Sequence, residues 1–368
     1  MMLEGVVVID LSRILAGPFA AQALAQLGAD VIKVEPPEGD PSRGIGPFIG
    51  SRSLYFSSLN TGKRGVVVDL KTAEGKARLD LLLDRADIVI ENFRPAAADR
   101  LGLDADAALA TRPELVWVSI PAFRASSGRS NDPGYDLTAQ AESGIMSVTG
   151  ESGGPPLRAG VAIGDLSTGL WAAIAALGGY IRRIRTGRGS RVEVPLVDAT
   201  MTLLSYVGTS ATATGEEPGP VGSGHHTLLP YGAFPTLDGW LAIAVIGDKF
   251  WIRLADALEL SPVDGLETNA ARAAASDAVN RMVSVALAGM TTESAIERLQ
   301  RADVPHAPIR SVIDAMTYPY GADAVESIET ESGSYHVVRA PTGEHLPLRP
   351  APKLGQHDSE VFDAKPRR

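Results

Sequence analysis

A single carboxylate stands at the head of a long uncharged segment. Asp165 directly precedes residues 166–181, which contain no charged side chain. Aspartate is a favoured N-cap residue, and a negative charge at a helix N-terminus is stabilised by about 0.3–1 kcal/mol. The same carboxylate can act as a nucleophile toward an activated carbonyl group. The segment by itself leaves both interpretations open.

Basic residues near predicted strand ends are the second group that could take part in binding or chemistry. Ligands of open parallel sheets bind at the carboxyl ends of the strands, so cations there can hold a phosphorylated small molecule. Surface solvation explains any one of them equally well. The candidates are Lys63, Arg64, Lys71, Arg94 and Arg100. A further basic cluster at 182–191 ends a predicted helix, where cations complement the helix dipole.

Several catalytic and ligand-binding motifs are absent or incomplete. GESGG at 150–154 matches G-x-S-x-G, but Pro155 and Pro156 follow where that motif requires a helix, so we expect a turn. The sequence contains no glycine-rich dinucleotide loop and no Walker A motif. The six histidines form no HExxH pattern and the chain has no cysteine. We therefore expect neither a metal site nor a catalytic thiol.

The hydrophobic pattern of the first half alternates between strands and helices. Short apolar runs rich in β-branched residues are separated by helical segments, which is typical of a parallel sheet covered by helices. We therefore expect an α/β fold. Predicted strands cover residues 5–10, 30–36, 65–70, 87–92 and 115–120, and predicted helices cover 18–29, 72–86, 134–148 and 165–185.

A Gly/Pro-rich stretch at 212–226 marks a candidate domain boundary, since 368 residues are enough for two domains. A second domain is expected to start near residue 226. Its predicted strands cover 239–246 and 304–309, its predicted helices cover 248–258, 269–288 and 292–302, and the tail from about 330 is expected to be extended.

The charge balance excludes some partners. The formal net charge of −10 disfavours nucleic acid and anionic membranes. The uncharged run at 166–181 is shorter than the roughly 20 residues that cross a bilayer. The first twelve residues lack a basic n-region and fit a strand better than a signal peptide. We expect a soluble, cytoplasmic protein.

Ordered segments of the chain together resemble family III CoA-transferases, also called the CaiB/BaiF family. Each segment is a weak signal alone, but their order and approximate spacing agree over residues 3–260. The segments are "VVVIDLSRILAGPFAAQALAQLGADVIKVEPPEGDPSR", "GKRGVVVDLKTAEGKA", "DIVIENFRPAAADRLGL", "PGYDLTAQAESGIMSVTGESGGPPLRAGVAIGDLSTG", "RTGRGSRVEVPLVDA" and "PYGAFPTLDGWLAIAV".

The resemblance implies a fold in two parts. A large Rossmann-like, CoA-binding domain would cover residues 1–200 and a linker 201–225. A smaller α/β domain would cover 226–330, and residues 331–368 would return to the large domain. Two chains would thread through each other as an interlocked-ring homodimer.

The resemblance also implies an activity. In these transferases the aspartate of the "GD" pair is the nucleophile, which is Asp165 here. It would attack a donor acyl-CoA to give a mixed anhydride, then an aspartyl-CoA thioester, before an acceptor carboxylate takes over the CoA. The helix cap would keep Asp165 ionised, and nearby backbone N–H groups would support the oxyanion. The partners would be an acyl-CoA and a small carboxylic acid, with no tightly bound cofactor and no metal.

The resemblance assigns CoA contacts to matching positions. Lys71, Arg94 and Arg100 are the expected phosphate partners, and Tyr135 and Asp136 are expected beside the thioester. The full set is Leu15, Ala16, Val68, Asp69, Leu70, Lys71, Asn92, Phe93, Arg94, Arg100, Tyr135 and Asp136. His225 and His226 lie in a glycine-rich stretch where the smaller domain could cover the acyl group.

Two alternatives stay open, one of them because of a departure from the family pattern. The loop "IPAFRASSGRSNDPGYD" has Pro121, Ala122 and Arg124 where the family commonly has glycines. A catalytically silent CoA-binding protein is one alternative. The other is a 2-methylacyl-CoA racemase of the same family, but racemases carry histidine where this chain has Tyr135. A neutral phenol with a pKa near 10 is a poor base.

Overall fold

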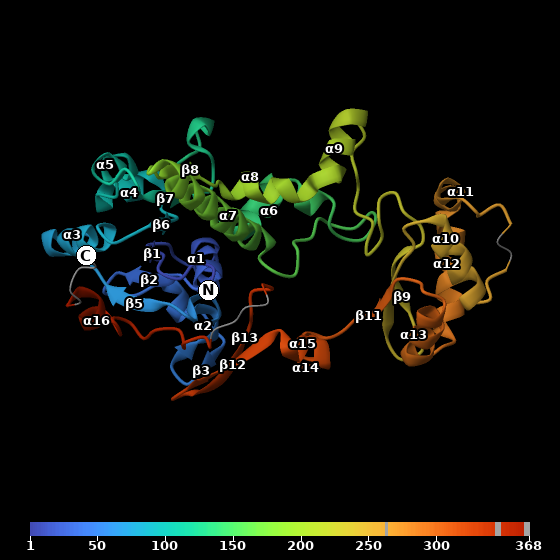
Figure 1. The fold of residues 1–368 in the computed structure, drawn as a ribbon. Coiled ribbons are helices and arrows are strands. Elements are labelled where there is room, and N and C mark those ends of the chain that lie inside the picture. Colours follow the sequence, from blue (N-terminus) through green and yellow to red (C-terminus); the bar gives the residue numbers. More distant parts are fainter. Residues whose placement is uncertain (262–263, 343–346, 364–368) are drawn as a thin grey trace. The chain divides into compact units, whose positions relative to one another are not determined.

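The computed structural model describes residues 1–261, 264–342 and 347–363. The chain divides into two compact units (Figure 1). Unit 1 comprises the described residues of Met1–Ile145, Arg158–Ser205 and Pro319–Arg368, and unit 2 comprises those of Met146–Leu157 and Tyr206–Tyr318. Residues 146–157, predicted within the large domain, thus belong to unit 2, and residues 319–330, predicted within the smaller domain, belong to unit 1.

A six-stranded parallel sheet forms the centre of unit 1. Its order is β5 (Arg64–Val67), β2 (Asp30–Glu35), β1 (Val7–Asp10), β6 (Ile88–Glu91), β7 (Val116–Ser119) and β8 (Ser190–Glu193). The order runs outward from β1 in both directions, which is the doubly wound arrangement. The expected Rossmann-like fold is confirmed. The edge strand β8 was not predicted.

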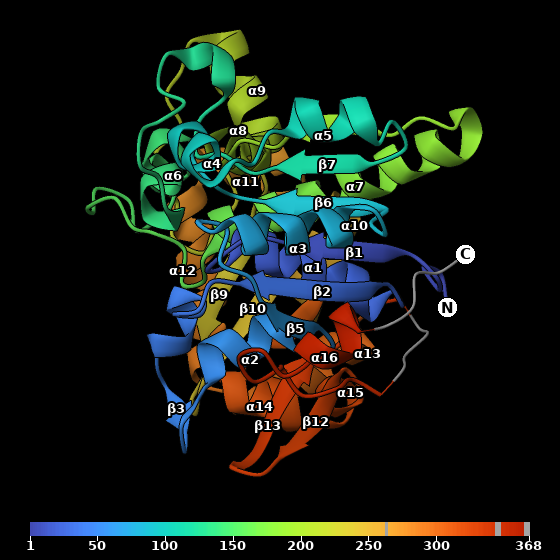
Figure 2. The ribbon, with the colours of Figure 1, turned by 90° about the vertical axis from the view of Figure 1, so that its left-hand side faces the viewer.

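Alternate residues of the strands bury against opposite helix layers. Val8 and Ile90 pack with helices α1 (Ala16–Gln26) and α7 (Ile163–Thr186). Ile9 and Val89 instead join the core beneath α3 (Ala73–Leu83) and α5 (Ala105–Thr111). Figure 2 looks onto the face that α3 covers. Both faces are buried, which explains why these strands read as continuous apolar runs.

Two glycines let α7 lie close against its neighbours. A Cβ at Gly169 would lie 2.7 Å from the carbonyl oxygen of Ala16 in α1. A Cβ at Gly179 would lie 2.6 Å from Cγ1 of Val116, at the start of β7. The C-terminal half of α7 thus packs at the amino end of the sheet. Its N-terminus, which carries Asp165, lies at the carboxyl edge.

Short elements complete the sheet's carboxyl edge and flanks. The predicted helix 134–148 is shorter, because the chain turns at Gly144 with φ +85°. The elements are β3 (Phe48–Ile49), β4 (Arg52–Ser53), α2 (Leu54–Asn60), α4 (Pro95–Leu101), α6 (Asp136–Glu142), α8 (Leu196–Met201), α15 (Pro319–Asp323) and α16 (Asp358–Phe362).

The expectation of an extended tail from 330 is wrong in part. Strands β12 (Val325–Thr330) and β13 (Gly333–Val338) form an antiparallel hairpin. Tyr335 and Val337 alternate with exposed residues and are buried, which is the period of a half-covered strand. The Tyr335 hydroxyl lies 2.8 Å from Thr61 Oγ1, so the hairpin is fixed to the end of α2.

Unit 2 is a small α/β structure around Trp251. Helix α9 (Ser205–Thr214) occupies part of the predicted linker, and the predicted helix 269–288 breaks at Ala275. The GESGG stretch is a turn, as expected, in which Gly154 N donates to Glu151 O. The sheet order is β11 (His306–Pro308), β10 (Trp240–Ala244), β9 (Tyr231–Pro235), with helices α10 (Asp248–Ala257), α11 (Asn269–Ala274), α12 (Ser276–Ala288), α13 (Thr292–Arg301) and α14 (Val312–Thr317). Over the described ranges of both units, no helix combines the length and apolarity needed to span a membrane.

Candidate active site

The loops after β1 and β6 meet where the strand order reverses. Asn92 joins them, because its Oδ1 accepts from Arg13 N and its Nδ2 donates to Arg13 O, both at 2.8 Å. Open α/β sheets bind ligands at this switch point. The predicted CoA residue Asn92 thus uses its amide to shape the loop after β1.

A groove opens at this edge between β1, β2, β5 and the loop after β6. The guanidinium of Arg13 lies 5.1 Å from the ring centroid of Phe93, and Lys71 Nζ lies 3.7 Å from Glu38. The groove has apolar walls and two cations. Its lining includes five of the predicted CoA residues, Val68, Asp69, Leu70, Lys71 and Phe93, together with Arg13, Glu38 and Leu101.

Seven other predicted CoA residues are absent from the lining of this groove: Leu15, Ala16, Asn92, Arg94, Arg100, Tyr135 and Asp136. Leu15 and Ala16 are buried at the start of α1. Arg94 and Arg100 are exposed at the two ends of α4. Arg13, which sequence reasoning missed, lies in the groove instead. Its only sequence signal was its place three residues after the end of the predicted strand 5–10.

Two of the strand-end cations are structural. Lys63 is fully buried and its Nζ donates to Asp10 Oδ2 and Pro18 O, both at 2.8 Å. Arg64 pairs with Asp30 at 2.6 Å, with its side chain mostly buried. Neither matches the solvated surface residue or the phosphate ligand considered for these positions.

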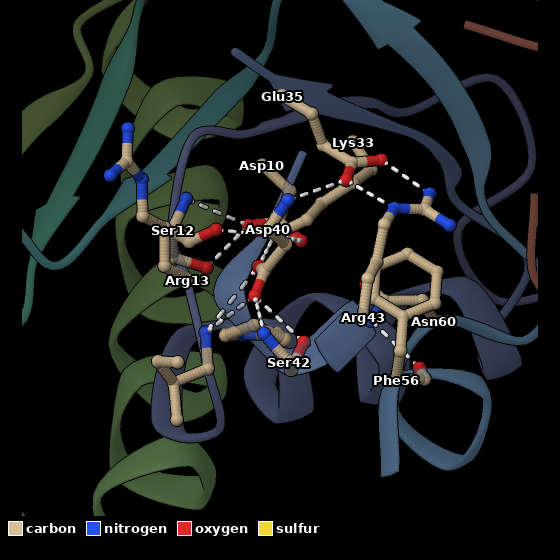
Figure 3. A network of polar contacts seen from close by, with 12 residues as sticks. Asp10, Ser12, Arg13, Lys33, Glu35, Asp40, Ser42, Arg43, Phe56 and Asn60 are labelled. Carbon is tan, nitrogen blue, oxygen red and sulfur yellow. Dashed lines mark hydrogen bonds and ion pairs between the residues drawn. The ribbon is translucent and has the colours of Figure 1, made fainter. Parts of the chain in front are cut away.

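A buried polar network holds the loop after β1 in place (Figure 3). Lys33 pairs with Asp40 at 2.9 Å and donates to Ser12 O. Asp40 accepts from Ile14 N at 3.3 Å and from Ser42 N at 2.9 Å. Burial alone raises the pKa of Asp40, but the Lys33 charge and the Ser42 hydrogen bonds outweigh it and lower the value to about 2.

Asp136, not Asp165, caps the helix that carries the proposed nucleophile. Helix α7 begins at Ile163 with Ala162 as its N-cap, so Asp165 is its third residue. Asp136 Oδ1 accepts from Gly164 N at 2.9 Å and from Asp165 N at 3.4 Å. The predicted N-cap role of Asp165 is wrong, because a carboxylate from α6 supplies it. Asp136 therefore lies beside the backbone of Asp165, and its expected place beside the thioester stays a prediction.

The backbone N–H groups of this first turn are occupied. Ile163 N donates to Val161 O and Leu166 N to Ala162 O, while the two between them donate to Asp136. These four N–H groups therefore already have partners, and support of an oxyanion by nearby backbone N–H groups stays a prediction.

The ionisation of Asp165 also differs from the expectation. Burial and, second, the charge of Asp136 raise the pKa of Asp165 from 3.8 to about 7. Desolvation disfavours the charged carboxylate and a neighbouring anion adds to the penalty. The helix cap does not keep Asp165 fully ionised, since near pH 7 the acid and the carboxylate are both populated.

Tyr55 on α2 lies within electrostatic range of the same acidic pair. Burial and the charges of Asp165, Asp40 and Asp136 raise the pKa of Tyr55. Its hydroxyl therefore stays a neutral hydrogen-bond donor near the two carboxylates. Sequence reasoning missed this residue, because a tyrosine in the apolar stretch "SLYF" reads as core. Tyr135, by contrast, is 65% exposed.

Buried Gln140 on α6 holds the segment before α7 against Asp136. Its Nε2 donates to Asp136 Oδ2 at 2.7 Å and its Oε1 accepts from Ala159 N at 2.9 Å. Arg158, next in the chain, places Nη1 3.6 Å from Asp136 Oδ2. A cation thus approaches the acidic pair from the solvent side.

The altered loop 121–133 is anchored at several points. Arg124 pairs with Asp198 at 2.8 Å, and Asn131 Oδ1 accepts from Ala96 N at 2.9 Å. Arg129 lies 3.9 Å from the ring centroid of Phe123. Ion pairs and a cation–π contact therefore fix this loop, in which other residues replace the glycines that the family commonly has.

In unit 2, His225 is held by its own loop. Its Nδ1 accepts from Thr227 N and Leu228 N, so the proton is on Nε2, which lies 2.9 Å from the Tyr206 hydroxyl. His226 Nε2 contacts Gly219 O at 3.0 Å. A role of either histidine at the acyl group stays a prediction. Within the described ranges, no group of three or more His, Asp or Glu is arranged to hold a metal ion.

A doubly wound sheet with a part-apolar, part-basic groove at its switch point is typical of α/β proteins that bind small molecules. The family model described as "CoA-transferase family III" matches residues 3–358. The chain is 36% identical to "Succinate--glutarate CoA-transferase" of Agrobacterium fabrum, over 98% of this chain and 94% of that protein. It is 34% identical to "Acetyl-CoA:oxalate CoA-transferase" of Acetobacter aceti, over 87% and 83%.

The solved structures agree with the sequence comparisons. A CaiB/BaiF family protein from Brucella suis superposes with a TM-score of 0.87 at 33% identity, over 98% of each chain. The chain belongs to CoA-transferase family III. It is an enzyme that transfers CoA from an acyl-CoA to a carboxylic acid, with CoA thioesters as its substrates.

Proposed function

We propose that Asp165 is the nucleophile of the CoA transfer. The observation that carries the proposal is a carboxylate with a pKa near 7, fixed at the carboxyl edge of the sheet by a second carboxylate. A more basic carboxylate is a stronger nucleophile, while half of it remains ionised at neutral pH. Ordinary surface aspartates lack this combination.

The proposed cycle balances without ATP. The Asp165 carboxylate attacks the donor thioester, and the C–S bond breaks to give an anhydride and CoA thiolate. The thiolate attacks the Asp165 carbonyl, which gives an aspartyl-CoA thioester and the free donor acid. The acceptor carboxylate then attacks that thioester, and the released thiolate attacks the acyl carbonyl of the second anhydride. The new acyl-CoA leaves with the Asp165 carboxylate restored.

The acidic pair favours the covalent intermediates. In the free enzyme Asp136 accepts from the backbone N–H of Asp165, and its charge helps to raise the pKa of the Asp165 carboxyl. Acylation converts Asp165 into a neutral anhydride or thioester, so the repulsion disappears in those states. We further propose the Tyr55 hydroxyl as the oxyanion donor, because it is neutral and near both groups.

We propose that the groove beside Phe93 holds the nucleotide part of CoA, with Lys71 and Arg13 near its phosphates. The contacts expected for Leu15, Ala16, Asn92, Arg94, Arg100 and Tyr135 remain proposals. For the acids we propose short dicarboxylates, because the two named relatives act on succinate and glutarate, and on oxalate. A cytoplasmic location also stays a prediction.

We propose that the active enzyme is a homodimer in which the outer face of α7 is covered. Large apolar side chains repeat there at helical spacing and are exposed in the single chain. They are Leu170, Trp171, Ile174, Ile181 and Ile184. Light scattering tests this: a monomer at micromolar concentration contradicts the proposal, and Ile174→Lys is expected to shift a dimer toward monomer.

Peptide-mapped mass spectrometry after incubation with a panel of acyl-CoAs and hydroxylamine tests the nucleophile. Hydroxylamine converts an activated aspartate into a hydroxamate, so the Asp165 peptide is expected to gain that mass with a competent donor. Transfer without any label on this peptide contradicts the assignment. No label and no transfer favours the silent binding protein, and exchange of the α-proton of a 2-methylacyl-CoA favours the racemase.

A further inference from the structure

Arg158 is a cation held next to the acidic pair but only loosely paired with it. Its Nη1 lies 3.6 Å from Asp136 Oδ2, which is longer than a hydrogen bond. Its Nη2 donates to Gly160 O at 3.4 Å. The side chain is 49% exposed. Guanidinium donors thus remain free to bind a ligand that comes from solvent.

A hydrogen bond to helix α6 fixes the segment that carries Arg158. Ala159 N donates to Gln140, which is fully buried and also donates to Asp136. The backbone beside Arg158 is therefore fixed to the same α6 side chains that fix the start of α7. Within residues 1–261, 264–342 and 347–363, Asp136 has one cationic partner, Arg158.

An acceptor acid must bring negative charge to a site that already contains two carboxylates. Asp136 lies between Arg158 and the backbone of Asp165, with one oxygen toward each. One carboxylate group thus separates Arg158 from the backbone of the residue that carries the proposed nucleophile. A short diacid can span such a separation, with one end at each side.

We propose that Arg158 binds the second carboxylate of a short-chain dicarboxylic acid while the first carboxylate reacts at Asp165. This inference rests on the proposed function of Asp165. Arginine suits the role because its planar guanidinium binds a carboxylate in a bidentate manner. Binding the distal carboxylate orients the acid, whereas a clamp on the reacting carboxylate would stabilise its charge and weaken it as a nucleophile.

The test compares succinate with butyrate, which has the same chain length but one carboxylate. The donor is the acyl-CoA without a second carboxylate that labels Asp165 most strongly. For Arg158→Met we expect kcat/KM for succinate to fall about 10- to 100-fold, as for loss of a charged hydrogen bond. The value for butyrate is expected to stay within about twofold, and Arg158→Lys is expected to restore part of the loss.

Arg191→Met is the matched control, since Arg191 is 50% exposed and pairs with Asp106 at the start of α5. It is expected to leave both acids unaffected. An equal loss for succinate and butyrate in Arg158→Met overturns the inference, because it shows an effect through Asp136 or the fold. No loss for succinate also overturns it.

Hydroxylamine labelling of Asp165 separates this inference from the proposed function. If Arg158→Met is labelled normally by the donor and loses only the diacid preference, both proposals are supported. If the wild-type enzyme transfers CoA without any label at Asp165, the proposed function fails. If the wild type is labelled but prefers butyrate to succinate, only the role of Arg158 fails.

Discussion

Unit 1 contains two acidic pairs, and the pKa of Asp165 in one pair is shifted in the opposite direction to the pKa values of Asp10 and Asp40 in the other. Asp10 and Asp40 face two buried lysines, and the pKa of Asp40 is about 2. Asp165 faces Asp136, and its pKa is about 7. Burial raises the carboxyl pKa in both places, so the counter-ion decides the outcome. The first pair holds the fold, and the second is available for chemistry.

The two pairs have opposite linkage to pH. The folded pKa of Asp40 is below its unfolded value, so its stabilisation is present above about pH 4 and is lost as the pH falls toward 2. The folded pKa of Asp165 is above 3.8, so its favourable contribution is present below about pH 4 and is lost as the pH rises through 7. Ionised Asp165 therefore destabilises the fold at the pH where it works.

The largest expected effect is that of Asp165→Asn. Loss of the nucleophile is expected to lower CoA transfer by at least about 10³-fold. The same variant is expected to be more stable than wild type at pH 8 by about 2–4 kcal/mol, because a buried charge beside Asp136 is removed. Urea unfolding and a coupled transfer assay measure the two effects. If the variant is less stable than wild type at pH 8, the two acidic pairs do not have opposite effects on stability and the prediction is wrong.

Removing a counter-ion from the first pair is the reciprocal experiment. Lys33→Met leaves Asp40 buried without its closest cation and is expected to destabilise the protein by about 3–5 kcal/mol. Acid unfolding is expected to begin at higher pH, since the pKa of Asp40 rises. Lys353→Met is the control, because Lys353 is 60% exposed and its pair with Glu331 is expected to contribute under about 1 kcal/mol. Equal urea midpoints for the two variants would contradict the prediction.

The contrast also separates what the sequence predicts from what it does not. Apolar runs such as 5–10 and 87–92 predicted strands correctly, because a strand that is buried on both faces has apolar residues at successive positions. Edge strand β8 is half exposed and mostly polar, so it carries no such pattern. The resemblance of ordered segments to the family singled out Asp165 and Phe93 as candidate site residues. Charge state, however, depends on partners far away along the chain, such as Asp136 and Tyr55.

Tyr55→Phe is expected to have an intermediate effect. Loss of this proposed oxyanion donor is expected to lower kcat about 10- to 100-fold, with little change in KM for the acyl-CoA. The raised pKa of Tyr55 predicts that the rate does not fall as the pH approaches 10 on account of this group. A change confined to KM would assign Tyr55 to substrate binding instead.

The smallest effect, and the sharpest test of the contrast, is that of Asp136→Asn. The new amide oxygen can still accept from Gly164 N, but the negative charge is gone. We expect the acidic limb of kcat/KM, near pH 7 in wild type, to move down by about one unit. The new amide nitrogen faces the Gln140 amide, so stability falls as well. The readout is therefore the position of the limb rather than the rate.

Gln140→Met controls for that side effect, because it breaks the same hydrogen bond and keeps the Asp136 charge. Its limb is expected to stay within a few tenths of a unit of wild type, even where its rate falls. If both variants shift the limb equally, packing around α6 sets the pKa of Asp165. If Asp136→Asn alone lowers it, the pair of like charges is what prepares this aspartate for acylation, since within the described residues no lysine pairs with Asp165 as Lys33 and Lys63 pair with Asp40 and Asp10.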